Sequence, residues 1–120
     1  MTDAAPLLAL VELCMVTTTV ANEAEARRLA QAVLHARLAA CVQVEPITSH
    51  FRWQGVVQED RELRMVCKTH PEAVPALLGL LRSQHSYALP QLAVQTLQVS
   101  ADYAQWVRSE VVVPSPVVQA

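Results

Sequence analysis

The sequence predicts one α+β domain of the split βαβ (ferredoxin-like) kind, spanning residues 1–120. Three observations predict it. The chain has 120 residues, the length of a single domain with a sizeable core. Apolar side chains repeat with the period of strands in some segments and of helices in others. These segments follow one another as strand, helix, strand, strand, helix, strand and a short last helix.

Residues 7–18 are expected to form the first strand. Both alternating sets of side chains in it are largely apolar, so the strand should be buried on both faces. A helix over residues 22–39 follows, because Asn22 stands three residues before Glu25, at the spacing of a capping box. Its apolar residues recur at helical spacing: Ala26, Leu29, Ala30, Val33 and Leu34.

A long hairpin comes next. Residues 41–53 form an extended segment interrupted at Pro46, and residues 56–69 form the returning strand, with alternating apolar and polar side chains. Gln54 and Gly55 supply the tight turn between them.

The second half of the chain repeats the pattern. Thr69 and Glu72 are expected to cap a helix over residues 71–85. An alternating strand over residues 92–99 follows.

A short helix after Ser100 would present Tyr103, Trp106 and Val107 on one face. Residues 111–120, which include two prolines, are expected to be an extended C-terminal tail.

Composition excludes some classes of function. The formal net charge is -2, and no basic stripe suggests a nucleic-acid surface. No apolar run reaches the roughly 18 residues of a membrane span. The three cysteines fit neither a disulfide framework nor a metal knuckle, which favours reduced thiols in the cytoplasm.

The long hairpin predicts self-association. Residues 41–53 would span roughly 43 Å as a strand, whereas the first helix covers about 25 Å. The overhang carries apolar side chains that need a cover: Ile47, Phe51, Trp53 and Val57. A closed homo-oligomer is the simplest cover. The alternative is that the C-terminal tail folds back over the sheet.

Five short motifs carry a resemblance. They are Leu38-Ala39-Ala40-Cys41-Val42, Trp53-Gln54-Gly55, the stretch from Glu62 to Thr69, His85-Ser86-Tyr87 with Pro90, and Tyr103-Ala104-Gln105-Trp106. In this order and spacing they resemble the CutA family of divalent-cation tolerance proteins over about residues 8–109. The resemblance implies a ferredoxin-like fold, a tight homotrimer held partly by the hairpin, a cytoplasmic bacterial protein, and an association with divalent metals, notably copper.

The chain departs from the family pattern at three positions. Ser86 stands where the family has a proline, and Gln91 replaces a glutamate, which removes a hard anionic ligand. Thr18 stands where some relatives carry a cysteine, a soft ligand. The resemblance therefore transfers fold and assembly better than copper binding.

A candidate site follows from strand parity. Glu62, Arg64 and Lys68 share the strand face away from the helices, which in a trimer lies at a subunit boundary. The predicted intersubunit cleft comprises Glu62, Lys68, His85, Tyr87 and Trp53, and would take a small anion or a metal ion. The alternative is an ion-pair network that only fixes the geometry of assembly.

Two candidate metal ligands stand out. They are His85 and Cys41, for copper or another divalent metal. Each has a simpler interpretation, His85 as a dipole partner at a helix end and Cys41 as a packing residue.

A soft Cu(I) site is a further hypothesis. It takes the first and third strands as parallel neighbours and gathers Cys14, Met15, Met65 and Cys67. The alternative is that the two cysteines among them are small core residues.

Two functions remain open. The first is a trimeric protein of divalent metal tolerance or binding; the alternative is a metal-independent trimeric scaffold or small-molecule sensor that acts through its intersubunit clefts. Enzyme activity is not expected. The two glycines, Gly55 and Gly79, make no phosphate-binding loop, and no Ser or Cys stands in a nucleophile elbow.

Overall fold

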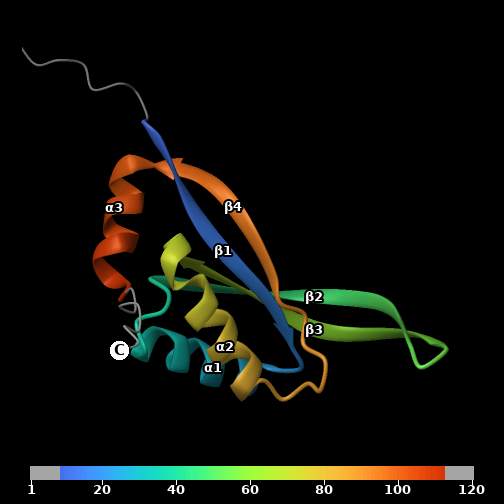
Figure 1. Ribbon diagram of the computed structural model, residues 1–120. Helices are drawn as coiled ribbons and strands as arrows, with labels where there is room; N and C mark the ends of the chain where they lie inside the picture. The colour runs from blue at the N-terminus through green and yellow to red at the C-terminus, as the bar shows by residue number, and fades with distance from the viewer. Residues whose placement is uncertain (1–8, 113–120) are drawn as a thin grey trace, which may run out of the picture.

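The structure is a computed structural model that describes residues 9–112. One four-stranded antiparallel sheet has the order β2-β3-β1-β4. Helices α1 and α2 lie along one face, and α3 lies at one end (Figure 1). This arrangement confirms the predicted ferredoxin-like fold. The elements are β1 (Leu10–Val20), α1 (Glu23–His35), β2 (Cys41–Trp53), β3 (Val56–Thr69), a 3-10 turn (Pro71–Ala73), α2 (Val74–Gln84), β4 (Ala93–Ser100) and α3 (Ala101–Glu110).

Strand β1 occupies the centre of the sheet and runs antiparallel to both neighbours. The expectation of parallel first and third strands was wrong. The crossover through α1 makes β2 parallel to β1, and the hairpin then reverses the chain before β3 inserts between them. Val16 lies opposite Cys67, whereas Met15 lies opposite Lys68 on the other face. The sheet therefore separates Met15 from the sulfur atoms of Met65 and Cys67.

Two apolar clusters hold the sheet and helices together. The larger lies between the sheet and the helices α1 and α2, and its buried residues are Val16, Val20, Ala26, Leu29, Val33, Ala39, Met65, Cys67, Leu77 and Leu81. The smaller packs Leu13, which points to the opposite face, against Ala104 and Val107 of α3. Helix α3 thus covers one end of the second face and leaves the rest of that face open.

The first strand and the first helix have different bounds from those predicted. Strand β1 begins at Leu10, which is 56% exposed, so burial on both faces starts only at Leu13. Helix α1 ends at His35 because Arg37 adopts a left-handed φ of 57°. The Leu38 N–H then donates to the Val33 carbonyl, which closes the helix end as a Schellman motif does.

Distant contacts explain these local deviations. The Arg37 guanidinium donates to the carbonyls of Ser109 and Glu110 at the end of α3. Likewise, His70 rather than Thr69 caps the turn before α2: its Nδ1 accepts from the Glu72 N–H. The Thr69 hydroxyl donates instead to the Leu38 carbonyl.

The hairpin has the predicted bounds, and Pro46 does not interrupt it. Proline is tolerated there because β2 is an edge strand of the sheet. Gln54 and Gly55 have φ values of 51° and 81°, as a type I′ turn requires.

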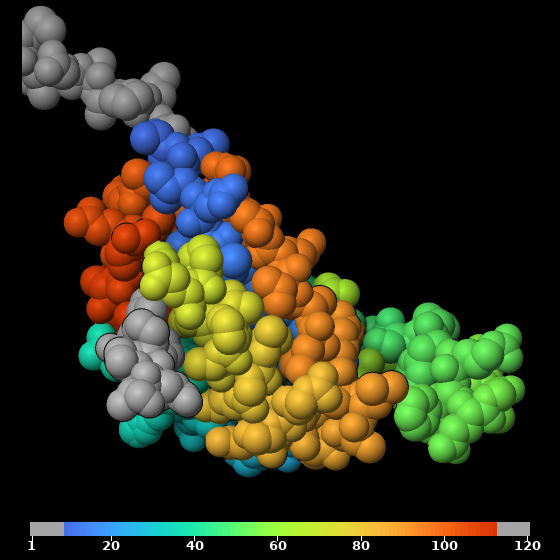
Figure 2. Space-filling model, viewed as in Figure 1, coloured from blue at the N-terminus to red at the C-terminus, as the bar shows by residue number. Residues whose placement is uncertain are grey.

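Beyond the last β1–β3 pair, Val20 with Leu63, the hairpin continues alone. It projects from the domain in Figure 1, and Figure 2 shows it as a separate arm. The arm exposes the large apolar side chains Phe51, Trp53, Val56 and Val57.

The chain continues past α3 through Val111 and Val112. Val111 is buried with the smaller cluster, and the Val112 N–H donates to the Arg37 carbonyl. The rest of the predicted tail, residues 113–120, lies outside the described residues, as does the predicted strand start at residues 7–8.

Candidate functional site

The candidate site lies on the face of the sheet opposite α1 and α2. Met65 and Cys67 point into the core, so Glu62, Arg64 and Lys68 point to the second face. On this face, the Arg64 Nη1 lies 2.9 Å from Oε1 of Glu45, its partner on β2. Both side chains are largely exposed, so this ion pair contributes little to stability by itself.

His85 links the end of α2 to β1. Its Nε2 lies 2.9 Å from the Thr19 carbonyl oxygen and 3.0 Å from the Thr18 hydroxyl. Its Nδ1 accepts from the Tyr87 N–H at 3.0 Å. A carbonyl only accepts and a backbone N–H only donates, so the ring is neutral with its proton on Nε2. Both nitrogens are therefore occupied within the chain.

Tyr87 joins this histidine to the sheet. Its ring centroid is 5.0 Å from that of His85, and its hydroxyl donates to Glu62 Oε2 at 2.9 Å. Burial and then the hydrogen bond to Glu62 raise the pKa of Tyr87 to about 12. The phenol therefore stays protonated at neutral pH and can act as a donor to the carboxylate.

Helix α1 contacts the end of α2, just before the loop that carries His85 and Tyr87. Arg28 Nη2 lies 2.8 Å from Glu25 Oε2 and donates to the Gln84 carbonyl, at the end of α2. The hydrogen bond from Arg28 lowers the pKa of Glu25, and smaller contributions in the same direction come from Ser86 and His85. Sequence reasoning missed Glu25 and Arg28 as neighbours of the site. Their i, i+3 spacing predicts an ion pair on the surface of α1, but it does not predict the contact of Arg28 with the end of α2.

Lys68 and Cys41 form a different group. They are partners across β2 and β3, and Lys68 Nζ lies 6.0 Å from the Tyr103 ring centroid. Burial and then Cys41 raise the pKa of Tyr103. Lys68 is six residues from Glu62 along β3, which is roughly 20 Å.

The residues of the predicted cleft are therefore not gathered within one chain. Glu62, His85 and Tyr87 meet, whereas Lys68 lies at one end of the sheet. Trp53 lies on the projecting arm, where it pairs with Val56. Val56 is six residues before Glu62 on β3, so Trp53 lies roughly 20 Å from Glu62.

Two of the three cysteines lie apart from these groups. Cys14 and Cys67 are both buried, and Cys67 lies in the cluster beneath α1 and α2. Desolvation raises the pKa of Cys67 to about 12, with Cys41 adding to the shift. Cys41 is half-buried on the other face. Among residues 9–112, no three His, Cys, Asp or Glu side chains are grouped to hold a metal. None of the helices in this range has the length and apolar character of a membrane crossing.

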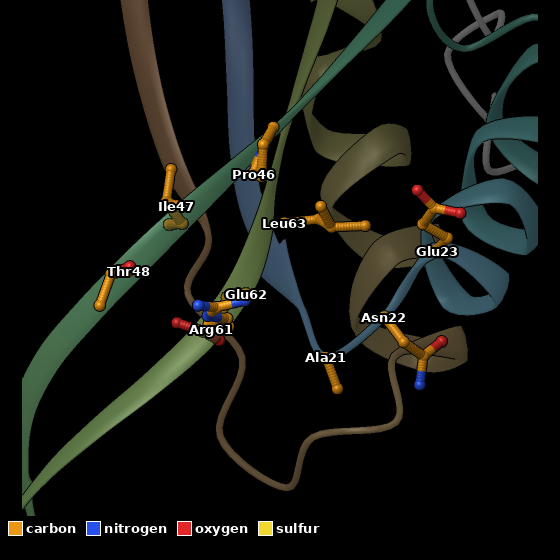
Figure 3. A pocket seen from close by; sticks show the side chains of 9 residues that line it. All are labelled: Ala21, Asn22, Glu23, Pro46, Ile47, Thr48, Arg61, Glu62 and Leu63. Carbon is orange, nitrogen blue, oxygen red and sulfur yellow. The ribbon is translucent and has the colours of Figure 1, made fainter.

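A cavity of about 460 Å³ adjoins Glu62. It lies between the connection from β1 to α1 and the part of the hairpin where β2 and β3 begin to extend beyond β1 (Figure 3). Its lining comes from three segments: Ala21 to Glu23, Pro46 to Thr48, and Arg61 to Leu63. Of the predicted cleft residues, Glu62 alone contributes to this lining.

Comparisons with known proteins agree with one another. Residues 14–110 match the CutA1 family, described as divalent ion tolerance protein. The human protein CutA is 44% identical over 92 residues, which cover 75% of this chain and 51% of that protein. The match thus spans about half the length of this relative.

Two solved structures have the same fold. CutA from Synechococcus elongatus has 44% identity and a TM-score of 0.82, covering 87% of this chain and 96% of that one. The periplasmic divalent cation tolerance protein CutA from Archaeoglobus fulgidus has 27% identity and a TM-score of 0.79, covering 83% and 98%.

Proposed function

The chain belongs to the CutA1 divalent ion tolerance protein family, and from this premise we propose that it acts as a homotrimer in tolerance to divalent metals, copper in particular. The ligand site lies in the clefts between its subunits. The projecting hairpin is the observation that carries the proposal.

The arm supports the assembly. Phe51 is 37% exposed and Trp53 43%, and Val56 lies beside Trp53 on the same face. Apolar side chains clustered on a projecting strand pair are typical of an interaction surface. A closed ring of three copies would bury this face of each arm against a neighbour.

The spread of the candidate residues supports a site between subunits. Glu62, Lys68 and Trp53 lie on one face of the sheet, but within one chain Lys68 and Trp53 are each roughly 20 Å from Glu62, on opposite sides of it. Packing the arm of one copy across the sheet of another would bring Trp53 of the first copy to the Glu62 or Lys68 group of the second.

The mass of the protein in dilute solution tests the assembly. One chain has a mass of 13.2 kDa, so the proposal expects three times that mass, independent of concentration over the micromolar range. A stable monomer contradicts both the trimer and the intersubunit site.

Equilibrium dialysis with Cu(II), Cu(I) and Zn(II) tests the metal. The proposal expects saturable copper binding that weakens in His85→Ala and in Cys41→Ser. Cys14→Ser is the matched control for the thiol, because Cys14 is a buried core residue.

A second candidate is a metal-independent scaffold or small-molecule sensor. The hydrogen bonds of His85 favour it, since a metal could bind the ring only by displacing Tyr87 or Thr19. Absence of a saturable, His85-dependent copper site in the same dialysis supports this candidate over the first.

We place the protein in the cytoplasm and assign it no catalytic step. Its three cysteines are free thiols, as is usual in a reducing compartment. Cell fractionation tests the location, and recovery of the protein with the periplasmic fraction would contradict it.

A further inference from the structure

We propose that residues 113–120 bind a groove between α1 and β2 of their own chain. This segment, the 113–120 segment, has the sequence Val-Pro-Ser-Pro-Val-Val-Gln-Ala. The groove lies on the helix side of the sheet, away from the face that carries the candidate site. The inference therefore goes beyond the proposed function and does not depend on it.

The groove has a volume of about 420 Å³. Val44 and Pro46 of β2 lie opposite Met65 and Leu63 of β3, and both of these β3 side chains belong to the core beneath α1 and α2. The groove is therefore on the helix side. Most of its lining is apolar, namely Ala26, Ala30, Val44, Pro46 and Leu63, and its charged members are Glu23 and Arg27.

The strand side of the groove exposes apolar surface to water. Val44 is 45% exposed, because β2 is an edge strand of the sheet and α1 covers it only in part. Pro46 is exposed as well, and together with Leu63 it also lines the cavity beside Glu62 (Figure 3). Apolar side chains laid along this strip would remove it from water, which is favourable.

The path of the chain leads to this groove. Val111 is buried in the smaller cluster, against which Ala40, directly before β2, also packs. The next residue, Val112, donates its N–H to the carbonyl of Arg37, just past the end of α1 (Figure 1). The 113–120 segment therefore follows a residue that lies beside the end of α1 and the start of β2. These are the two elements that flank the groove.

The segment is long enough to reach the groove lining. An extended proline-rich chain rises about 3.1 Å per residue, so Val117 would lie about 16 Å along the segment. A helix rises about 1.5 Å per residue, so the way back along α1 is about 10 Å from Arg37 to Ala30 and about 17 Å to Ala26. Val117 and Val118 can therefore reach this part of the groove.

The composition of the segment suits an apolar groove. Pro114 and Pro116 favour an extended backbone in the residues before them. Prolines also carry no N–H, so they bring no donor that would be left without a partner there. Val117 and Val118 follow directly and supply apolar side chains. The tether holds them near the groove at an effective concentration of the order of millimolar, so a small apolar contact is sufficient.

Methyl NMR of the full chain tests the proposal. In the wild type, we expect nuclear Overhauser contacts from the methyl groups of Val117 or Val118 to those of Val44 and Ala30. A mixture of isotope-labelled and unlabelled copies separates contacts within a chain from contacts between copies. The proposal expects the contacts to arise within one chain.

Two matched variants test the role of the valines. In the double variant Val117→Asp, Val118→Asp, carboxylates replace the apolar side chains, and burying them in the groove is unfavourable. The contacts should be lost, and the Val44 methyl groups should become more accessible to a soluble paramagnetic probe. The control Ser115→Asp, Gln119→Asp adds the same charge to the same segment at polar positions and should keep the contacts. Helical circular dichroism checks the fold of both proteins.

Three results would overturn the proposal. The first is contact between copies, which would make a second copy the occupant of the groove. The second is contact of Val117 and Val118 with the opposite face of the sheet. The third is equal accessibility of Val44 in the wild type and in the aspartate variant of the valines. A monomeric mass or an absent copper site would refute the proposed function without affecting any of these readouts.

Discussion

A histidine that follows a helix has two ring nitrogens to satisfy, and in this protein the partners of those nitrogens decide what the ring can do. Thr19 and Tyr87 supply one acceptor and one donor, which fixes a single neutral tautomer. The same ring with one nitrogen exposed would be an ordinary metal ligand. The identity of the residue is therefore a weaker guide to its chemistry than the two atoms beside it.

Tyr87 gives the stability of the protein an alkaline dependence. Its pKa is about 12 in the folded protein and about 10 in an unfolded chain. The stabilisation from the protonated phenol is thus complete below about pH 10 and is lost as the pH rises toward 12. Urea unfolding at pH 9 to 12 should show the wild type losing more free energy of unfolding than Tyr87→Phe. Parallel curves for the two proteins would contradict the raised pKa.

Cys67 should be inert to thiol reagents in the folded protein. Burial raises its pKa to about 12, so almost none of it is thiolate at neutral pH. With iodoacetamide at about pH 8, we expect Cys67 to react at least about a hundredfold more slowly than the half-buried Cys41. Mass spectrometry of peptides measures both rates, and unfolding in urea should make all three cysteines reactive. Equal rates in the folded state would contradict the burial of Cys67.

At the scale of the element, the hairpin turn can be improved. Gln54 and Gly55 both have positive φ, a conformation that asparagine adopts more readily than glutamine. Gln54→Asn should raise the free energy of unfolding by up to about 1 kcal/mol, as measured by urea denaturation. Gly55→Ala should lower it by a similar amount. No atom lies within 4 Å of the added Cβ, so that loss would come from the backbone conformation alone. An unchanged Gly55→Ala protein would contradict this account.

The elements also show what a sequence can and cannot predict. The hairpin bounds follow from alternation and a two-residue turn, which are local signals, and they were correct at both ends. The predicted end of α1 was wrong, because Arg37 donates to carbonyls more than 70 residues away in the sequence. Parity placed Glu62 and Lys68 on one face but could not show that Lys68 meets Tyr103 instead of His85. The contact between His85 and Thr19, 66 residues apart, has no local signature.

At the scale of the whole molecule, the projecting arm should control assembly without controlling the fold. Phe51 and Trp53 lie beyond the last β1–β3 pair and outside both apolar clusters. The double variant Phe51→Ser, Trp53→Ser should therefore have the mass of a monomer, with the helical circular dichroism of the wild type. Arg52→Ser, on the opposite face of the same strand, is the control and should keep the wild-type mass. A double variant that stays trimeric would show that Phe51 and Trp53 of the arm do not hold the interface together.

The central position of β1 has a consequence for the order of folding. Strands β2 and β3 are joined by a two-residue turn and can pair as soon as both are made. Strand β1 instead pairs Leu10 with Ser100, 90 positions later. Contacts of such long range form slowly because a large loop must close first. On the ribosome, the first strand synthesised therefore keeps an unpaired edge until nearly the last residues of the domain emerge, and in that interval it is most exposed to aggregation.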